Sequence, residues 1–87
     1  MQIKQNLSME KKIKDIIIVG AGGFGREIKF LIDNINKIEK QFNIIGFVDD
    51  NLEKGQIING IEVIGNLNTL LEIKKPISVV FGIGDPV

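Results

Sequence analysis

The chain has 87 residues, a length that holds one small domain. Its composition is that of a globular protein, with 44% hydrophobic and 25% charged residues, and its formal net charge is zero. This balance removes the electrostatic argument for binding nucleic acid or an anionic membrane, so we expect neither partner. The absence of cysteine excludes a disulfide framework and fits a reducing cytoplasm, where we expect the protein to reside.

Histidine is also absent, which removes the commonest general base and the commonest metal ligand. Without histidine or cysteine, the usual nucleophile–base pairs cannot be completed. No apolar run approaches the roughly 20 residues of a membrane span. We therefore expect no catalytic residue, no metal site and no membrane-spanning segment.

Residues 1–13 are polar, with scattered apolar residues that share no period, and predict a flexible leader before a single domain over 14–87. Met9 is an alternative start, because the residues after it lead directly into an apolar run.

The β-branched run at 15–19 predicts a buried strand. It breaks into glycines that fit the pattern G-x-G-x-x-G, with one extra glycine inside the pattern. The glycines are Gly20, Gly22, Gly23 and Gly25.

Apolar residues spaced by three and four then predict a helix over about 23–36. The face that we expect it to bury is formed by Phe24, Ile28, Leu31, Ile32, Ile35 and Ile38. Gly25 in the first turn costs about 1 kcal/mol of helix propensity. Close packing of the helix on the strand is the usual reason to accept that cost.

Two further apolar runs, 43–48 and 77–81, predict strands. Between them, Asn59-Gly60 signals a turn within 57–65, which predicts a short hairpin or a bent extended segment. A second helix is predicted over about 67–74, with Asn66 or Asn68 as its cap. The alternation predicts an α/β fold: a small Rossmann-like, three-layer unit with a short parallel sheet.

The three predicted core strands each end in a glycine or aspartate cluster, at 20–25, 49–50 and 82–85. Parallel strands bring their carboxyl ends to one edge of the sheet, where ligands bind in open α/β folds. A glycine turn lets the backbone approach a phosphate, and the N–H groups at the start of the helix supply donors. The missing Lys-Ser/Thr pair excludes a Walker-type triphosphate loop.

Asp49 stands where a Rossmann domain places the carboxylate that binds a ribose hydroxyl, although it lies further from the glycines than the usual roughly 20 residues. An aspartate there disfavours a 2′-phosphate, which favours NAD or a uridine nucleotide over NADP. Asp50 either contacts another part of the ligand or caps the turn. For each of these residues, a turn without any ligand is the alternative interpretation.

Four blocks in order, IIIVGAGGFGREI, IIGFVDDN, INGIEVIGN and VVFGIGDP, resemble the N-terminal domain of the PglD/NeuD-type bacterial sugar acyltransferases. That family includes UDP-amino-sugar N-acetyltransferases and sialic acid O-acetyltransferases. The resemblance spans about Lys14 to Pro86 and implies a Rossmann-like domain that holds a nucleotide-sugar acceptor.

The resemblance also implies which residues contact the substrate. With Gly20 and Gly25 from the glycine motif, the candidate substrate-binding residues are Gly20, Gly22, Gly23, Phe24, Gly25, Asp49, Asp50 and Gly84. Some relatives carry a polar residue or histidine at the position of Phe24.

In that family a left-handed β-helix of hexapeptide repeats follows, binds acetyl-coenzyme A, carries the catalytic histidine and forms trimers. The given sequence ends at Val87, and we expect an excised domain, a truncated reading frame or a partial sequence. We expect no cofactor in this segment, and any homo-oligomer of full-length relatives to form through the β-helix.

The leading hypothesis is a binding domain for a nucleotide-sugar, specifically a UDP-sugar, that does not catalyse acyl transfer alone. An NAD-binding fragment of a Rossmann oxidoreductase and a regulatory α/β module with an empty site are the alternatives.

Overall fold

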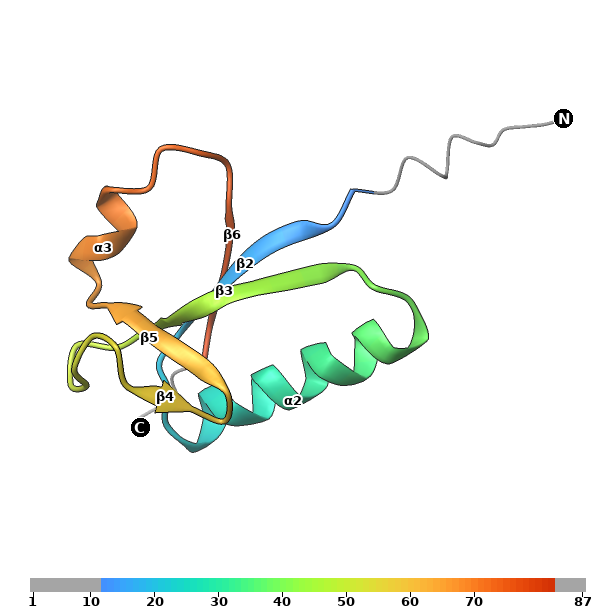
Figure 1. The fold of residues 1–87 in the computed structure, drawn as a ribbon, viewed down its shortest axis with the longest axis horizontal. Coiled ribbons are helices and arrows are strands. Elements are labelled where there is room, and N and C mark those ends of the chain that lie inside the picture. The colour runs from blue at the N-terminus through green and yellow to red at the C-terminus, as the bar shows by residue number, and fades with distance from the viewer. Residues whose placement is uncertain (1–11, 83–87) are drawn as a thin grey trace, which may run out of the picture.

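The computed structural model describes residues 12–82, which form one sheet and two helices (Figure 1). The elements in chain order are β2 (Lys14–Val19), α2 (Gly23–Ile38), β3 (Phe42–Val48), β4 (Ile57–Ile58), β5 (Ile61–Gly65), α3 (Asn68–Leu71) and β6 (Ser78–Phe81). The predicted core strands lie within one residue of β2, β3 and β6. Residues 1–11, which make up most of the predicted leader, and residues 83–87, which include Gly84, lie outside the described residues.

The sheet has the strand order β4-β5-β3-β2-β6, in which β5, β3, β2 and β6 are parallel and β4 is antiparallel to β5. Val19, the last residue of β2, pairs with Val48 of β3 and with Phe81 of β6. Val48 in turn pairs with Gly65 of β5. The carboxyl ends of four strands therefore meet at one edge, as the α/β prediction required.

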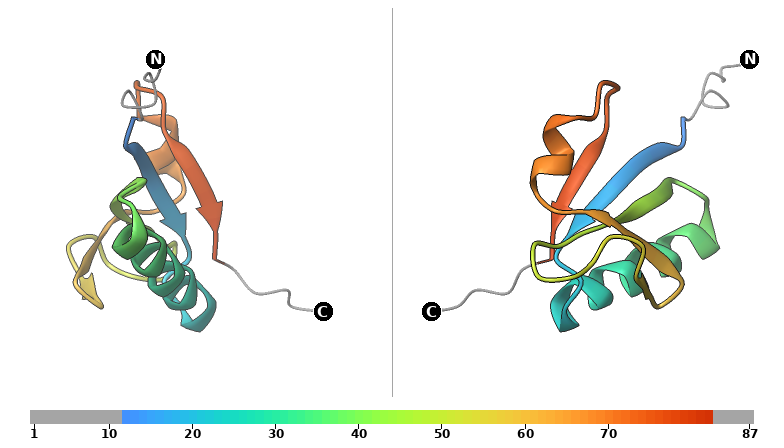
Figure 2. Two further views of the ribbon diagram at one scale, coloured as in Figure 1. Left: turned by 90° about the vertical axis from the view of Figure 1, so that its right-hand side faces the viewer. Right: turned by 60° about the vertical axis from the view of Figure 1, so that its left-hand side comes forward.

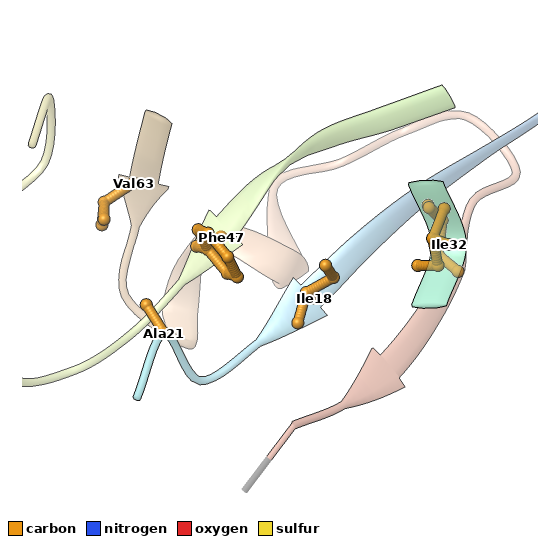
Figure 3. Close-up of a cluster of buried hydrophobic side chains, with 6 residues drawn as sticks. Ile18, Ala21, Ile32, Phe47 and Val63 are labelled. Atoms are coloured by element: carbon orange, nitrogen blue, oxygen red, sulfur yellow. The ribbon is translucent and has the colours of Figure 1, made fainter. Parts of the chain in front are cut away.

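Apolar side chains cover both faces of this sheet because alternate residues of a buried strand point to opposite sides. Ile18 of β2, Phe47 of β3 and Val63 of β5 lie in one cluster with Ile32 of α2 (Figure 3). On the other face, the buried cluster consists of Ile17, Val19 and Val48, against which Leu70 of α3 and Ile73 are packed. The two helices thus lie on opposite sides of the sheet (Figure 2), which confirms the three-layer, Rossmann-like fold.

Helix α2 begins at the predicted residue and runs two residues beyond the predicted end. It contacts the sheet through Gly25 and Ile32, which are buried, and through Ile28, which is half-buried. The other members of the expected buried face are exposed, with exposed fractions between 39% and 90%; they are Phe24, Leu31, Ile35 and Ile38. The expected face was therefore too wide, because the apolar stripe extends well beyond the side of the helix that meets the sheet.

The segment 57–65 forms the predicted hairpin. Asn59 and Gly60 have positive φ angles of 50° and 83°, as a type I′ turn requires, and β4 pairs antiparallel with β5. The parallel pairing of β5 with β3 was not predicted. It adds a fourth parallel strand and brings the residues after Gly65 to the same edge as the glycine loop.

The second helix is shorter than predicted, Asn68–Leu71 instead of 67–74. Asn66 acts at its start, since its Oδ1 accepts the Asn68 N–H at 3.0 Å. At its end the chain tightens: the N–H of Ile73 bonds to the carbonyl of Leu70, three residues back. This 3₁₀-type turn ends the α-helix, and Ile73 packs against the buried cluster.

Candidate functional site

The backbone of Gly20 sets the conformation of the glycine loop between β2 and α2. Gly20 has a φ of 99°, a conformation that favours glycine, and its N–H donates to the carbonyl of Val48 at 2.7 Å. This bond ties the end of β2 to the end of β3. The chain can then turn back sharply and enter α2 within three residues.

Gly25 lets the helix approach the strand ends closely. A Cβ at this position would lie 2.8 Å from the carbonyl carbon of Gly20, within the range where atoms overlap. A Cβ at Gly82 would lie 2.5 Å from the Gly25 Cα, so the three glycines form one close contact between α2, β2 and β6. The role of Gly25 is thus in packing the start of α2 against the sheet.

Gly22 and Gly23 have no such role in the fold. A Cβ at either position would meet nothing within 4 Å, and neither residue has a positive φ. Among the described residues, the N–H groups of Gly22, Gly23 and Phe24 have no hydrogen-bond acceptor. No acidic residue occupies the first turn of α2, and the cap residue Gly22 has no side chain to satisfy these donors.

Asp49 connects the glycine loop to the turn after β3. Its Oδ2 accepts the Ala21 N–H at 2.9 Å, and its Oδ1 accepts the Asn51 N–H at 2.8 Å. Its own N–H donates to the carbonyl of Gly65 at 3.0 Å. Asp50 extends this network, because its Oδ1 accepts the Leu67 N–H at 2.8 Å. The acidic pair therefore joins the ends of β2, β3 and β5.

A cleft of about 370 Å³ opens at this edge of the sheet. Six of the eight predicted site residues line it: Gly20, Gly22, Gly23, Phe24, Asp49 and Asp50. Gly25 lies beneath the loop in the helix–strand contact, and Gly84 is outside the described residues.

The cleft also contains residues that were not predicted as site residues. Asn51 and Leu67 line it, together with the strand-end residues Val19 and Val48. Gly82 also lines it and belongs to the cluster 82–85 that was expected at this edge. Asn51 directly follows the acidic pair, so its position in the sequence was an available signal. Leu67 reaches the cleft only because β5 pairs with β3 and because Asp50 holds its N–H.

The charged side chains in the cleft lining are carboxylates. Arg26, in the first turn of α2, is exposed and donates from its Nε to the carbonyl of Gly22 at 3.4 Å. Within residues 12–82, no three His, Cys, Asp or Glu side chains are grouped closely enough to hold a metal ion. Neither helix in this range has the length and apolar character needed to cross a bilayer. Among the described residues that line the cleft, the backbone N–H groups without an acceptor at Gly22, Gly23 and Phe24 are therefore available to an anionic ligand.

The comparison with known families matches one domain over nearly the whole chain. Residues 15–87 match the PglD N-terminal domain family. No curated protein and no solved structure was found to match.

Proposed function

The chain belongs to the PglD N-terminal domain family, and from this premise we propose that it binds a nucleotide-sugar, specifically a UDP-sugar, in the cleft at the carboxyl edge of the sheet. The bound sugar would be the acceptor for acyl transfer. The 87 residues contain no histidine or cysteine, so we assign them binding of the acceptor and not the transfer itself.

The observation that carries this proposal is the open space at Gly22 and Gly23. The fold does not need glycine at either position, since a Cβ would meet nothing there. Their N–H groups, with that of Phe24, have no acceptor among the described residues and lie at the positive end of a 16-residue helix. A diphosphate fits this arrangement, because it accepts several N–H bonds and is attracted by the helix dipole.

The NAD-binding alternative receives less support. A Rossmann oxidoreductase uses the carboxylate after its second strand to accept bonds from the ribose hydroxyls. Here each oxygen of Asp49 already accepts one backbone N–H group, so only part of the acceptor capacity of this carboxylate is left for ribose hydroxyls. NAD is therefore included in the test as the competing ligand.

We test the proposal by isothermal calorimetry with UDP, UDP-glucose, UDP-N-acetylglucosamine and NAD. Saturable heat is expected with UDP and at least one UDP-sugar. A ligand at 100 times its dissociation constant would also stabilise the fold by about 2.7 kcal/mol, which thermal unfolding would detect. Saturable heat with NAD alone would support the oxidoreductase alternative, and no heat with any ligand would reject binding by a folded domain.

The variant Gly22→Leu sharpens this test. The side chain would enter the open space above the loop, so we expect a folded protein whose affinity for UDP falls at least about tenfold, the equivalent of about 1.4 kcal/mol. Lys54→Leu, an exposed change in a residue that does not line the cleft, is the control and should leave the affinity unchanged. Equal affinities of both variants and the natural chain would place the ligand elsewhere.

A further inference from the structure

The carboxylate of Asp49 is already used within the protein. One oxygen holds the N–H of Ala21 in the glycine loop, and the other holds the N–H of Asn51 in the turn after β3. The residue is half-buried in the wall of the cleft. Both oxygens thus accept hydrogen bonds from backbone N–H groups of the two segments that line the cleft, the glycine loop and the turn after β3.

The side chain of Asn51 is in the opposite situation. It is exposed, it lines the cleft, and its amide makes no hydrogen bond to another described residue. A carboxamide offers two N–H donors and a carbonyl acceptor. It can therefore pair with groups that both donate and accept, such as the imide edge of a uracil base or a sugar hydroxyl.

We propose that Asp49 is a positioning residue, and that Asn51 is the side chain of this turn that meets the ligand. The inference rests on the nucleotide-sugar function proposed above. Asp49 acts through two bonds: the bond to Ala21 keeps the following N–H groups aimed into the cleft, and the bond to Asn51 keeps that residue at its rim. This reverses the role expected for Asp49 by analogy with a ribose-binding carboxylate.

The first arm of the test needs no ligand. Amide hydrogen exchange is measured by NMR for the natural chain and for Asp49→Asn, whose carboxamide keeps one acceptor oxygen in the same volume. Exchange at Ala21 or Asn51 should accelerate at least about tenfold, because a hydrogen bond to a charged group is lost. The matched control is Asp50→Asn, which keeps an oxygen that can accept the Leu67 N–H and should leave exchange at Ala21 unchanged. Unchanged exchange at both Ala21 and Asn51 in Asp49→Asn would overturn the positioning role.

The second arm adds UDP at saturation. If Asp49 positions the loop, Ala21 stays protected in the complex; if Asp49 turns to contact the ligand, protection of Ala21 falls and the proposal is wrong. Asn51→Ala should weaken UDP or UDP-sugar binding about tenfold without changing the melting temperature or the protection of Ala21. Gln56→Ala removes a carboxamide from the same loop outside the cleft lining and should not change affinity.

The two proposals fail in different ways. If no UDP ligand binds to the folded protein, the proposed function and the assignment of Asn51 are both rejected, while exchange at Ala21 in the free protein still decides the role of Asp49. If UDP binds but Asn51→Ala binds it equally well, the function stands and the assignment of Asn51 is wrong.

Discussion

Glycine occupies the positions of the G-x-G-x-x-G pattern for three different physical reasons. Gly20 is needed for its positive φ, and Gly25 is needed because a side chain would overlap the backbone of Gly20. Gly22 and Gly23 are required by neither conformation nor packing, and under the proposed function their small size leaves space for the ligand. A sequence motif alone cannot distinguish these reasons, since it records only that glycine is present.

This division predicts opposite outcomes for two alanine substitutions in one loop. Gly25→Ala should destabilise the fold by about 3 kcal/mol, because its Cβ would force the start of α2 away from the sheet. Gly22→Ala should change stability by less than about 0.5 kcal/mol, since its Cβ meets nothing. Urea unfolding followed by circular dichroism measures both values. Similar losses in the two variants would contradict the distinction.

Sequence reasoning identified most of the cleft because its residues lie next to strand ends. The glycine loop and the acidic pair are contiguous in the sequence and follow predicted strands, so their meeting required only a parallel sheet. The sequence did not predict the hydrogen-bond partners of the acidic pair. The bonds from Ala21 to Asp49 and from Leu67 to Asp50 connect residues 28 and 17 positions apart. Their formation depends on the register of three strands.

At the scale of the element, the period of α2 predicted a helix but not its orientation. Six apolar positions spaced by three and four cover a wide arc, and only the part with Ile28 and Ile32 meets the sheet. Gly25 explains the orientation, because the close contact with Gly20 and Gly82 fixes which side of the first turn faces the strands.

Neighbouring residues of α2 test this orientation. Ile32→Ala should cost about 3 kcal/mol, because Ile32 is 5% exposed within the main buried cluster. Leu31→Ala should cost less than about 1 kcal/mol, because Leu31 is 58% exposed. Chemical unfolding of the two variants gives the comparison. A larger loss for Leu31→Ala would mean that the helix presents Leu31, and not Ile32, to the sheet.

The connection after α2 shows another contribution that the sequence pattern did not reveal. The Oδ1 of Asn36 accepts the N–H groups of Gln41 and Phe42, and its Nδ2 donates to the carbonyl of Phe42. One side chain thus holds the turn that leads from the helix into β3. Since asparagine is common in loops for several reasons, only the folded geometry identifies this function.

At the scale of the whole molecule, different side chains connect the strands at the two ends of the parallel sheet. The carboxyl edge carries the cleft and is joined by Asp49 and Asp50. At the amino edge, Asp15 at the start of β2 joins two other segments: its Oδ2 accepts from Lys75 at 3.0 Å, and its Oδ1 accepts from Asn43 at 3.2 Å. The sequence pattern predicted a parallel α/β sheet. It did not predict the hydrogen bond between Asp15 and Lys75, because these residues are 60 positions apart.

The tie at the amino edge makes stability depend on pH in a definite direction. The hydrogen bond from Lys75, followed by that from Asn43, holds the pKa of the Asp15 carboxyl below its ordinary value. An unfolded aspartate titrates near about 3.9, so the contribution of Asp15 is fully present above that pH and is lost as the pH falls through the lower folded pKa. Asp15→Asn should therefore be less stable than the natural chain at pH 7, and the two should converge below about pH 4.

Urea unfolding of both proteins between pH 7 and pH 2.5 measures this convergence. The difference at pH 7 should be small, since the ion pair is solvent-accessible, and should shrink further in high salt. Lys75→Gln removes the largest cause of the lowered pKa, so it should flatten the acid dependence more than Asn43→Ala does. A stability difference between the natural chain and Asp15→Asn that stays constant across this pH range would show that the ionised carboxylate is not what joins these segments.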